Sequence, residues 1–237
     1  MSLKLYYDLM SQPSRAVLIF LRMNKIPFTD QAVALRRGQH LEDDYAKVNP
    51  FKQVPAIDDN GFTLTESSAI LKYLADSYLG ENSHHWYPKD AKKRAKADEY
   101  LDWHHLNTRM NCSVYFQHRS IRPALKKAPV DLKKLENYKS GVLKVAAAID
   151  SYFLQDRKFM LGSEVSIADL QAVCELEQVL TVGLDPFRDH QRLADWAKRV
   201  RDITQPHYEG ATTTVYGVAQ RLLQKLKDDK LDSGLGA

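Results

Sequence analysis

A change of hydrophobic periodicity near residue 80 constrains the fold of this chain more than any other feature of its sequence. Before it, strand-like and helix-like patterns alternate, and after it only helix-like patterns recur. Leu3, Leu5 and Tyr7 alternate with polar residues, which predicts a strand, and after Pro13 the apolar residues follow helical spacing as far as Met23. The pattern predicts a small α/β unit followed by a helical one.

The first 80 residues contain further elements of both kinds. The Asp59–Asn60–Gly61 stretch favours a hairpin turn between two short strands. The predicted order is strand, helix, strand, helix, strand, strand and helix, which indicates a mixed sheet. After the first helix we expect a strand at 26–35, a short helix at 40–49, strands at 54–58 and 62–65, and a helix at 66–78.

From residue 90 onward the sequence predicts helices alone. Ser166 and Asp169 form a capping-box pattern ahead of an apolar run, so a helix is expected to begin there. We therefore predict an α/β domain at 1–80, a linker at 81–89 and an all-α domain at 90–237, with the ligand cleft between the domains. The helical patterns cover 90–122, 131–155, 166–182, 190–204 and 213–230.

The composition argues against several classes of function. The 237 residues carry 34 basic and 30 acidic side chains, and the net charge of +4 is too balanced to indicate nucleic-acid binding. No run of about 18 apolar residues is present, so no membrane span is expected. Cys112 and Cys174 are the only cysteines, and their spacing indicates neither a disulfide framework nor a metal site. The N-terminus has no secretory signal pattern, so a cytoplasmic protein is expected.

Pro55 stands at the start of a predicted strand, within the stretch VPAI. Proline cannot donate to a strand ladder, so an ordinary strand-initiating proline is one interpretation. The other is a cis peptide bond, which would turn the backbone N–H and C=O of Val54 toward an extended peptide ligand.

Glu66 and Ser67 lie where a strand passes into a helix, within ESSAIL. The carboxylate could bind an ammonium group, while the hydroxyl and the helix N-terminus could bind a carboxylate. Plain N-capping by Thr65 or Ser67 explains the same residues without a ligand. His40, Lys52 and Gln53 flank the second helix and could also contact a carboxylate, although solvent-exposed loop residues would look the same.

Ser11 is placed between the first strand and the first helix. A hydroxyl at a helix N-terminus can cap the helix, and it can also donate to a bound anion. Tyr6, Tyr7 and Ser14 are the competing hydroxyls in this stretch. Tyr7 shares a strand face with Leu3 and Leu5, which favours core packing, and Ser14 falls inside the first helical turn.

Taken together, these motifs resemble those of the cytosolic glutathione transferases, and the resemblance covers nearly the whole chain. It rests on VPAI at 54–57, ESSAIL at 66–71 and SIADL at 166–170, in this order. Three further stretches, and the extra C-terminal helix expected at 213–230, resemble those of the theta class. These are SQPSRA at 11–16, GQHL at 38–41 and LDWHH at 101–105.

The resemblance implies a thioredoxin-like first domain and an enzyme that attaches the glutathione thiolate to hydrophobic electrophiles. It also implies a possible peroxidase activity, glutathione as co-substrate, and a homodimer. The alternative is a non-catalytic ligand-binding or assembly module of the same fold. The absence of a cysteine near Ser11 argues against glutaredoxin-like chemistry.

The resemblance assigns a role to each matching residue. Ser11 would bind the thiolate, in preference to Tyr6 or Tyr7, because SQPSR is typical of the serine-using classes. Val54 would pair with the cysteinyl backbone, with Pro55 cis. The γ-glutamyl end would bind Glu66 and Ser67. His40 and Gln53 would lie near the glycine end or the cysteinyl segment, although the theta class often has lysine at the position of Gln53. The electrophile would contact Leu9, Met10, Asn107, Arg109, Tyr115 and Phe116.

Overall fold

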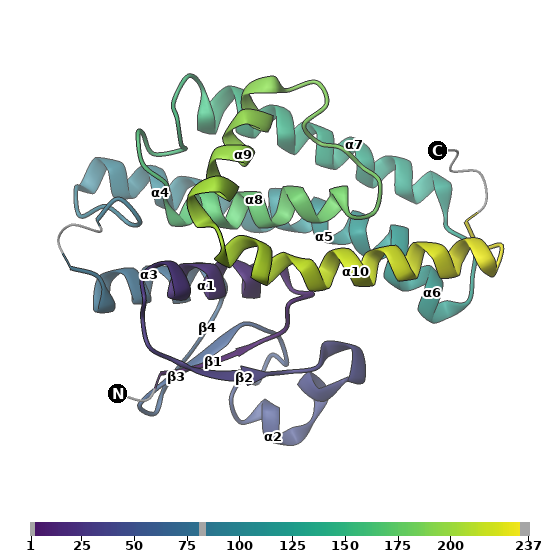
Figure 1. Ribbon diagram of the computed structural model, residues 1–237, viewed down its shortest axis with the longest axis horizontal. Helices are drawn as coiled ribbons and strands as arrows, with labels where there is room; N and C mark the ends of the chain where they lie inside the picture. The colour runs from purple at the N-terminus through teal and green to yellow at the C-terminus, as the bar shows by residue number, and fades with distance from the viewer. Residues whose placement is uncertain (1–2, 81–83, 233–237) are drawn as a thin grey trace.

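The computed structural model describes residues 3–80 and 84–232 and contains a four-stranded sheet below a layered set of helices (Figure 1). The sheet has the order β2-β1-β3-β4. β1 runs parallel to β2 and antiparallel to β3, and β3 and β4 form the predicted hairpin. The strands are β1 (Leu3–Tyr7), β2 (Thr29–Ala32), β3 (Ala56–Asp59) and β4 (Phe62–Thr65). The mixed sheet and its helices confirm the α/β, thioredoxin-like prediction for the first domain.

Three α-helices accompany the sheet. α1 and α3 lie between the strands and the helical domain, and α2 lies at the opposite side of the sheet (Figure 1). They are α1 (Gln12–Met23), α2 (Asp43–Ala46) and α3 (Ser67–Tyr78), with 3₁₀ turns at Leu35–Arg37 and Gln39–Leu41. The predicted linker at 81–89 lies partly outside the described residues.

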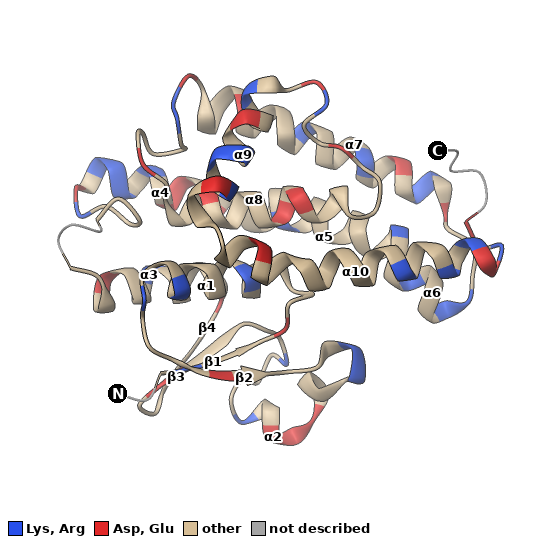
Figure 2. Ribbon diagram, in the orientation of Figure 1, with Lys and Arg blue, Asp and Glu red and all other residues tan. Residues whose placement is uncertain are grey.

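The second domain is all-helical, as predicted. Its helices are α4 (Ala91–His104), α5 (Met110–Phe116), α6 (Arg122–Lys126), α7 (Leu132–Ala148), α8 (Ile167–Leu180), α9 (Gln191–Thr204) and α10 (His207–Asp228). Across the described residues, no helix is both long and apolar enough to cross a membrane. Charges of both signs are interleaved along the outer helices (Figure 2).

The boundaries differ from the sequence predictions most clearly at four places. The short helix expected at 40–49 is only Asp43–Ala46, and the 3₁₀ turn Gln39–Leu41 precedes it. The expected strand at 26–35 is only Thr29–Ala32, because Pro27 cannot donate to a ladder. The pattern at 90–122 is one helical run, but π-helical turns interrupt it at His105–Arg109 and Gln117–Ile121. α10 begins at His207 rather than at 213, because threonines and glycines hide the periodicity of its first two turns.

α1 is the element that joins the two domains. Residues 12–21 are all buried, because α1 packs against β1 and α3 and also against α8 and α10. Buried Arg15 donates to the carbonyl oxygens of Leu9 (2.9 Å) and Cys174 (3.1 Å) and to Oε1 of Gln178 (2.7 Å). The carboxylate partner expected of an arginine is replaced by three neutral oxygens. One hydrophobic core extends from Leu3 in β1 to Leu226 in α10.

Candidate active site

A narrow groove of about 50 Å³ runs between the two domains. Its walls come from the N-terminus of α1, the loop before β3, the N-terminus of α3 and the first π-helical turn. The lining residues are Pro13, Asn49, Gln53, Val54, Pro55, Glu66, Ser67, His104, His105 and Arg109. The groove therefore gathers five of the sequence-predicted site residues from the first domain and Arg109 from the second.

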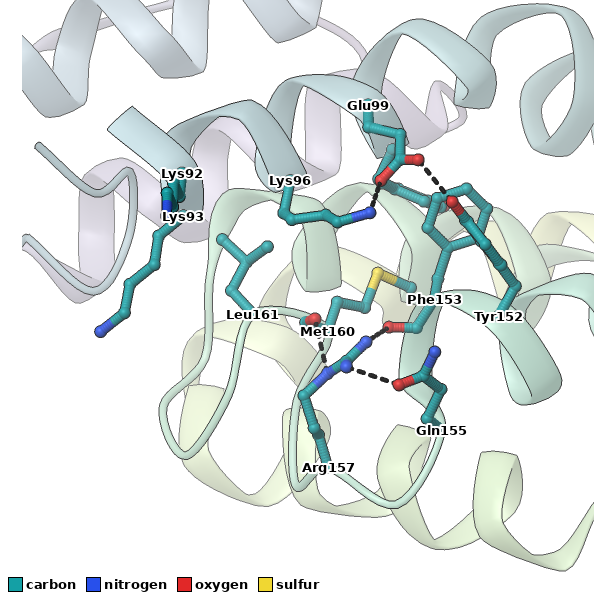
Figure 3. A pocket seen from close by; sticks show the side chains of 11 residues that line it. Lys92, Lys93, Lys96, Glu99, Tyr152, Phe153, Gln155, Arg157, Met160 and Leu161 are labelled. Carbon is teal, nitrogen blue, oxygen red and sulfur yellow. Dashed lines mark hydrogen bonds and ion pairs between the residues drawn. The ribbon is translucent and has the colours of Figure 1, made fainter. Parts of the chain in front are cut away.

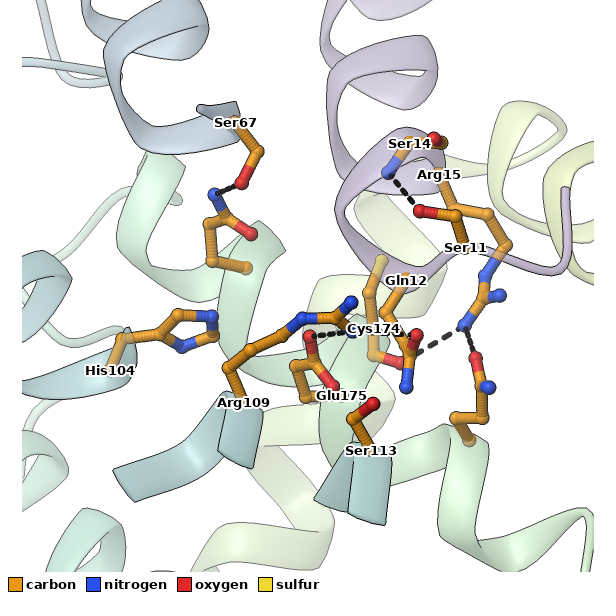
Figure 4. A network of polar contacts seen from close by, with 12 residues as sticks. Ser11, Gln12, Ser14, Arg15, Ser67, His104, Arg109, Ser113, Cys174 and Glu175 are labelled. Carbon is orange, nitrogen blue, oxygen red and sulfur yellow. Dashed lines mark hydrogen bonds and ion pairs between the residues drawn. The ribbon is translucent and has the colours of Figure 1, made fainter. Parts of the chain in front are cut away.

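Ser11 caps α1 beside this groove. Its backbone is extended, with φ −88° and ψ 119°, and Pro13 occupies the first turn of the helix. The hydroxyl donates to the Val54 carbonyl (3.3 Å) and accepts from the Ser14 amide (3.4 Å), and only 6% of the residue is exposed. Ser11 and Ser14 face each other at the start of α1 in Figure 4. The hydroxyl thus combines the capping role with contact to a groove residue.

The competing hydroxyls point to other partners. Tyr7 donates to Asp30 (2.9 Å) at the far side of β1, and its ring packs against the core. Burial, followed by the bond to Asp30, raises the pKa of Tyr7. The ring of Tyr6 packs against Tyr45 with centroids 6.1 Å apart. Ser14 is completely buried within α1. None of the four hydroxyls lines the groove, but that of Ser11 is hydrogen-bonded to the groove residue Val54.

The Val54–Pro55 peptide bond is cis, as the resemblance implied. The loop before it is held by the carbonyl of Gln53, which accepts from Tyr45 (2.6 Å) and from Nδ2 of Asn49 (2.8 Å). Asn49 is buried and fixes this loop, although its sequence context, just before a proline, gave no sign of that role.

Glu66 and Ser67 form the opposite wall. The alternative in which Thr65 or Ser67 caps α3 is not observed, because Glu66 occupies the N-cap position and its side chain makes no capping hydrogen bond. Its φ of 64° is strained for a residue other than glycine, and such strain concentrates at functional sites. The carboxylate lies 3.7 Å from Nε2 of His105, and the Ser67 hydroxyl accepts from Gln171 of α8 (2.8 Å).

Arg109 enters the groove from the helical domain, as predicted. Its Nη1 donates to Oε1 of Gln12 (2.7 Å) and to Oε1 of Glu175 (3.0 Å), which links α1, α8 and the π-helical turn (Figure 4). Glu175 is completely buried, and this burial raises the pKa of its carboxyl to about 6 even though Arg109 lowers it. The π-helical geometry shifts the helical register at the turn that carries Arg109.

Several groove residues were missed by sequence reasoning. His104 is buried, and desolvation lowers its pKa to about 3, so the ring is neutral and lies 3.1 Å from the Tyr100 hydroxyl. His105 faces Glu66. Among the described residues no group of three or more His, Cys, Asp or Glu side chains is placed to hold a metal ion. Gln171 and Glu175 of α8 contact the groove residues Ser67 and Arg109. The sequence could not show which face of this helix points toward the groove, because that depends on how the two domains pack.

Other predicted residues lie away from the groove walls. Tyr115 and Phe116 are both buried in the hydrophobic core of the helical domain, and their contact with the electrophile stays a prediction. Met10 is also buried, and Leu9 packs partly against the core. Asn107 donates to the Trp103 carbonyl within its own helix (2.8 Å).

His40 and Lys52 are also outside the groove. His40 is half-buried in the 3₁₀ turn Gln39–Leu41, and its Nδ1 is buried without a hydrogen-bond partner among the described residues. Lys52 donates to the Leu41 carbonyl (2.7 Å). Both side chains belong to the loop region on the same side of the sheet as α2.

Residues 1–76 match the model of the glutathione S-transferase N-terminal domain, and residues 115–206 match that of the C-terminal domain. Glutathione S-transferase theta-1 of Bos taurus is 42% identical over 200 residues, which covers 84% of this chain and 82% of the relative. The Mus musculus theta-1 protein is 43% identical with the same coverage.

The solved structures that resemble this chain include glutathione transferases as well. The apo form of human glutathione-S-transferase T1-1 superimposes with a TM-score of 0.86 at 36% identity, covering 95% of this chain and 97% of that one. Human glutathione transferase theta-2, in complex with glutathione and an unknown ligand, gives 0.88 at 34% identity, covering 94% and 91%.

Proposed function

Because this chain belongs to the glutathione S-transferase family, we propose that it conjugates the glutathione thiol to electrophilic small molecules and that Ser11 ionises this thiol. Its relatives are of the theta class, and glutathione is the co-substrate. The observation that carries the assignment is the Ser11 hydroxyl, which caps α1 and lies 3.3 Å from the Val54 carbonyl at the groove.

The proposed ionisation is energetically feasible. Lowering the pKa of a thiol from about 8.5 to about 6 requires roughly 3.4 kcal/mol. One hydrogen bond to a charged group contributes about 1.5–3 kcal/mol, and the N-terminus of a helix contributes up to about 1 kcal/mol. When glutathione binds, the Ser11 O–H turns from the Val54 carbonyl to the sulfur. The Val54 backbone then pairs with the cysteinyl residue of the tripeptide.

The rest of the tripeptide follows the groove. The γ-glutamyl end binds Glu66 and Ser67, a carboxylate and a hydroxyl at the start of α3. Gln53 contacts the glycine end or the cysteinyl segment from the groove wall, and His40 approaches from the neighbouring loop. The cis Pro55 belongs to the same binding segment.

The electrophile approaches from the helical domain. Arg109 faces the groove, and Leu9, Met10 and Asn107 surround the entrance to it in our proposal. The thiolate attacks an electrophilic carbon, a sulfur–carbon bond forms, and the leaving halide departs with the bonding electron pair. The enzyme contributes an ionised, positioned nucleophile and forms no covalent intermediate. The same thiolate can attack the outer oxygen of an organic hydroperoxide, which breaks the O–O bond and releases the alcohol, and a second glutathione thiol then forms the disulfide and releases water.

We also propose a homodimer in the cytoplasm. Several large hydrophobic side chains are exposed, notably Leu106 and Met110 in the helical domain and Phe51 and Phe62 in the first domain. Contiguous exposed hydrophobic surface is typical of protein interfaces. The two buried cysteines are both free, which agrees with a reducing compartment.

A turnover assay tests the catalytic assignment. We expect purified protein to consume glutathione with a small alkyl halide or with cumene hydroperoxide. Ser11→Ala should lower kcat by about tenfold or more, because it removes a charge-assisted hydrogen bond, and should leave glutathione binding largely intact. Tyr7→Phe is the matched control, since it removes a neighbouring hydroxyl that donates to Asp30.

Two outcomes oppose this proposal. If Tyr7→Phe abolishes turnover and Ser11→Ala does not, the nucleophile is activated by the tyrosine. If the wild-type protein turns over neither substrate, the non-catalytic ligand-binding or assembly module becomes the better account.

A further inference from the structure

The net positive charge of this chain is concentrated in one short segment. Residues 119–134 carry six basic side chains and one acidic side chain, a net charge of +5, whereas the whole chain carries only +4. The segment begins in the second π-helical turn, includes α6 and the loop after it, and ends in the first turn of α7. The rest of the chain therefore contributes no net positive charge.

The segment is fixed against the end of α10. Buried Arg119 pairs with Asp232 (3.0 Å), which follows α10, and the Val130 amide donates to the Leu231 carbonyl (3.0 Å). α10 also packs against α6. Figure 2 shows basic residues on α6, on the loop after it and at the end of α10. These contacts are made within the chain, so the surface is formed before any partner binds.

Four cations of this segment are uncompensated. Arg122, Lys126, Lys127 and Lys133 are exposed, and none of them forms an ion pair with any residue that the structure describes. The single acidic side chain of the segment pairs instead with Lys134 (3.2 Å). We call the four exposed cations the basic surface. Clusters of four or more lysines and arginines are typical of surfaces that bind anionic phospholipids.

The neighbouring His118 lies in the positive potential of this segment. Burial lowers the pKa of His118, and the positive charges of Arg122 and Lys134 lower it further. Lys126 also lowers this pKa, whereas Asp131 raises it. Cations from both α6 and α7 therefore act on the same point, which indicates one continuous positive surface across the two helices.

Large apolar side chains project from the same surface. Leu125 of α6 is 79% exposed, more than any other large hydrophobic side chain among the described residues, and it stands next to Lys126. Leu132, which is 42% exposed, precedes Lys133 in α7. A soluble polyanion would leave these leucines in water. A lipid bilayer offers anionic headgroups to the cations and hydrocarbon to the leucines.

We propose that the basic surface docks on the anionic face of a lipid bilayer, with its cations at the headgroups and Leu125 among the acyl chains. The contact is peripheral and reversible, because charge provides most of the attraction and the leucines enter only the interfacial layer. The basic surface shares no residue with the groove, so this inference does not depend on the proposed function.

Cosedimentation with lipid vesicles tests this surface. We expect the protein to pellet with vesicles of equal parts phosphatidylcholine and phosphatidylserine, and to stay in solution with vesicles of phosphatidylcholine alone. Salt at about 0.5 M should release the bound protein, because it screens exposed charges.

Two variants separate the contributions of charge and of the leucine. Lys126→Gln/Lys127→Gln should lower the vesicle partition coefficient by about tenfold or more, because each cation near an anionic surface adds to the attraction. Leu125→Asn should lower it by about fivefold, because a side-chain amide does not enter hydrocarbon.

Lys92→Gln/Lys93→Gln is the charge-matched control. Both lysines are exposed on the first turn of α4, beside a separate cavity (Figure 3). α4 begins at the opposite end of the molecule from α6 (Figure 1). Ile203→Asn, at a side chain of α9 that is 45% exposed, is the control for Leu125→Asn. Both controls should pellet with the anionic vesicles as the wild-type protein does.

Three results would overturn this inference. The first is a wild-type protein that does not pellet with the anionic vesicles. The second is an equal loss of binding in the two lysine variants. The third is a Leu125→Asn variant that pellets as well as the wild-type protein, because the surface would then recognise charge alone, as binding to a soluble polyanion requires.

Discussion

At the residue scale, Ser11 has an observed structural role as the cap of α1, and the catalytic role that we propose for it uses the same position. The hydroxyl caps α1 and, in the same position, reaches the Val54 carbonyl across the sheet edge. A group that satisfies the amides at a helix N-terminus lies in the positive field of that terminus. A thiolate bound beside Val54 would therefore accept a hydrogen bond from the Ser11 hydroxyl and be stabilised by the positive potential at the N-terminus of α1.

Glu175 is the buried partner of Arg109, and its titration can be measured through the pH dependence of the free energy of unfolding. Burial raises the pKa of Glu175 to about 6 from its ordinary 4.5. Because the folded state holds this proton more tightly than the unfolded state, Glu175 lowers the free energy of unfolding as pH rises through this window. The loss amounts to about 2 kcal/mol, at 1.36 kcal/mol per pH unit.

Glu175→Gln removes this titration. Its free energy of unfolding, relative to wild type, should rise by about 2 kcal/mol between about pH 4.5 and about pH 7. Urea denaturation at several pH values measures the difference. A flat difference for Glu175→Gln would mean that the carboxyl titrates normally in the folded protein.

Some candidate site residues could be predicted from the sequence, because they stand at the boundary of a helix or strand that the neighbouring residues indicate. Ser11 and Glu66 each precede a helix and Pro55 precedes a strand, so their positions follow from neighbouring residues, whereas their proposed roles rest on the family resemblance. His104 and Glu175 could not be predicted, because each reaches the groove region only through the packing of the two domains. For Tyr115 the sequence could not separate core packing from substrate contact, because its helical spacing fits a core face and a pocket face equally well.

At the scale of elements, α8 depends on a buried capping network. The Asp169 carboxylate accepts from the backbone of Met160 (3.0 Å) and Ser166 (2.9 Å), from the Ser166 hydroxyl (2.6 Å) and from Nε1 of Trp196 (2.7 Å). The capping box predicted from the sequence is therefore present. Its contacts to Met160 and Trp196 were not predictable, because they join segments distant in the chain.

Removing this carboxylate should be costly. Asp169→Ala leaves four buried donors without an acceptor and should lower the free energy of unfolding by about 3 kcal/mol or more. Ser166→Ala should cost about 1–2 kcal/mol. Asp90→Ala, which removes the exposed cap of α4, is the matched comparison at about 1 kcal/mol. Equal losses for Asp169→Ala and Asp90→Ala in urea denaturation would contradict the role of the network.

At the scale of the whole molecule, the two domains share one core and expose a hydrophobic surface. Leu106 and Met110 lie one turn apart on the long helical run, and 73% and 54% of them are exposed. Side chains at this spacing share a helix face. Burial of such a face in an interface fits the proposed homodimer.

The double variant Leu106→Glu/Met110→Glu should sediment as a monomer, because it places charges in the interface, while the wild-type protein sediments as a dimer. Analytical ultracentrifugation measures both. Leu125→Glu, at another exposed leucine on α6, should leave the dimer intact. A monomeric wild-type protein, or a double variant that remains dimeric, would contradict this use of the surface.

The ionisation of bound glutathione is the most direct test of Ser11 as the activating residue. The ultraviolet absorbance of the thiolate, followed against pH with the protein saturated by glutathione, gives the pKa of the bound thiol. We expect a midpoint near ~6 for the wild-type protein and a midpoint higher by about 1–2 units for Ser11→Ala, because about 1.5–3 kcal/mol of charge-assisted hydrogen bonding is lost. Equal midpoints in the two proteins, or a rise in Tyr7→Phe instead, would contradict the assignment.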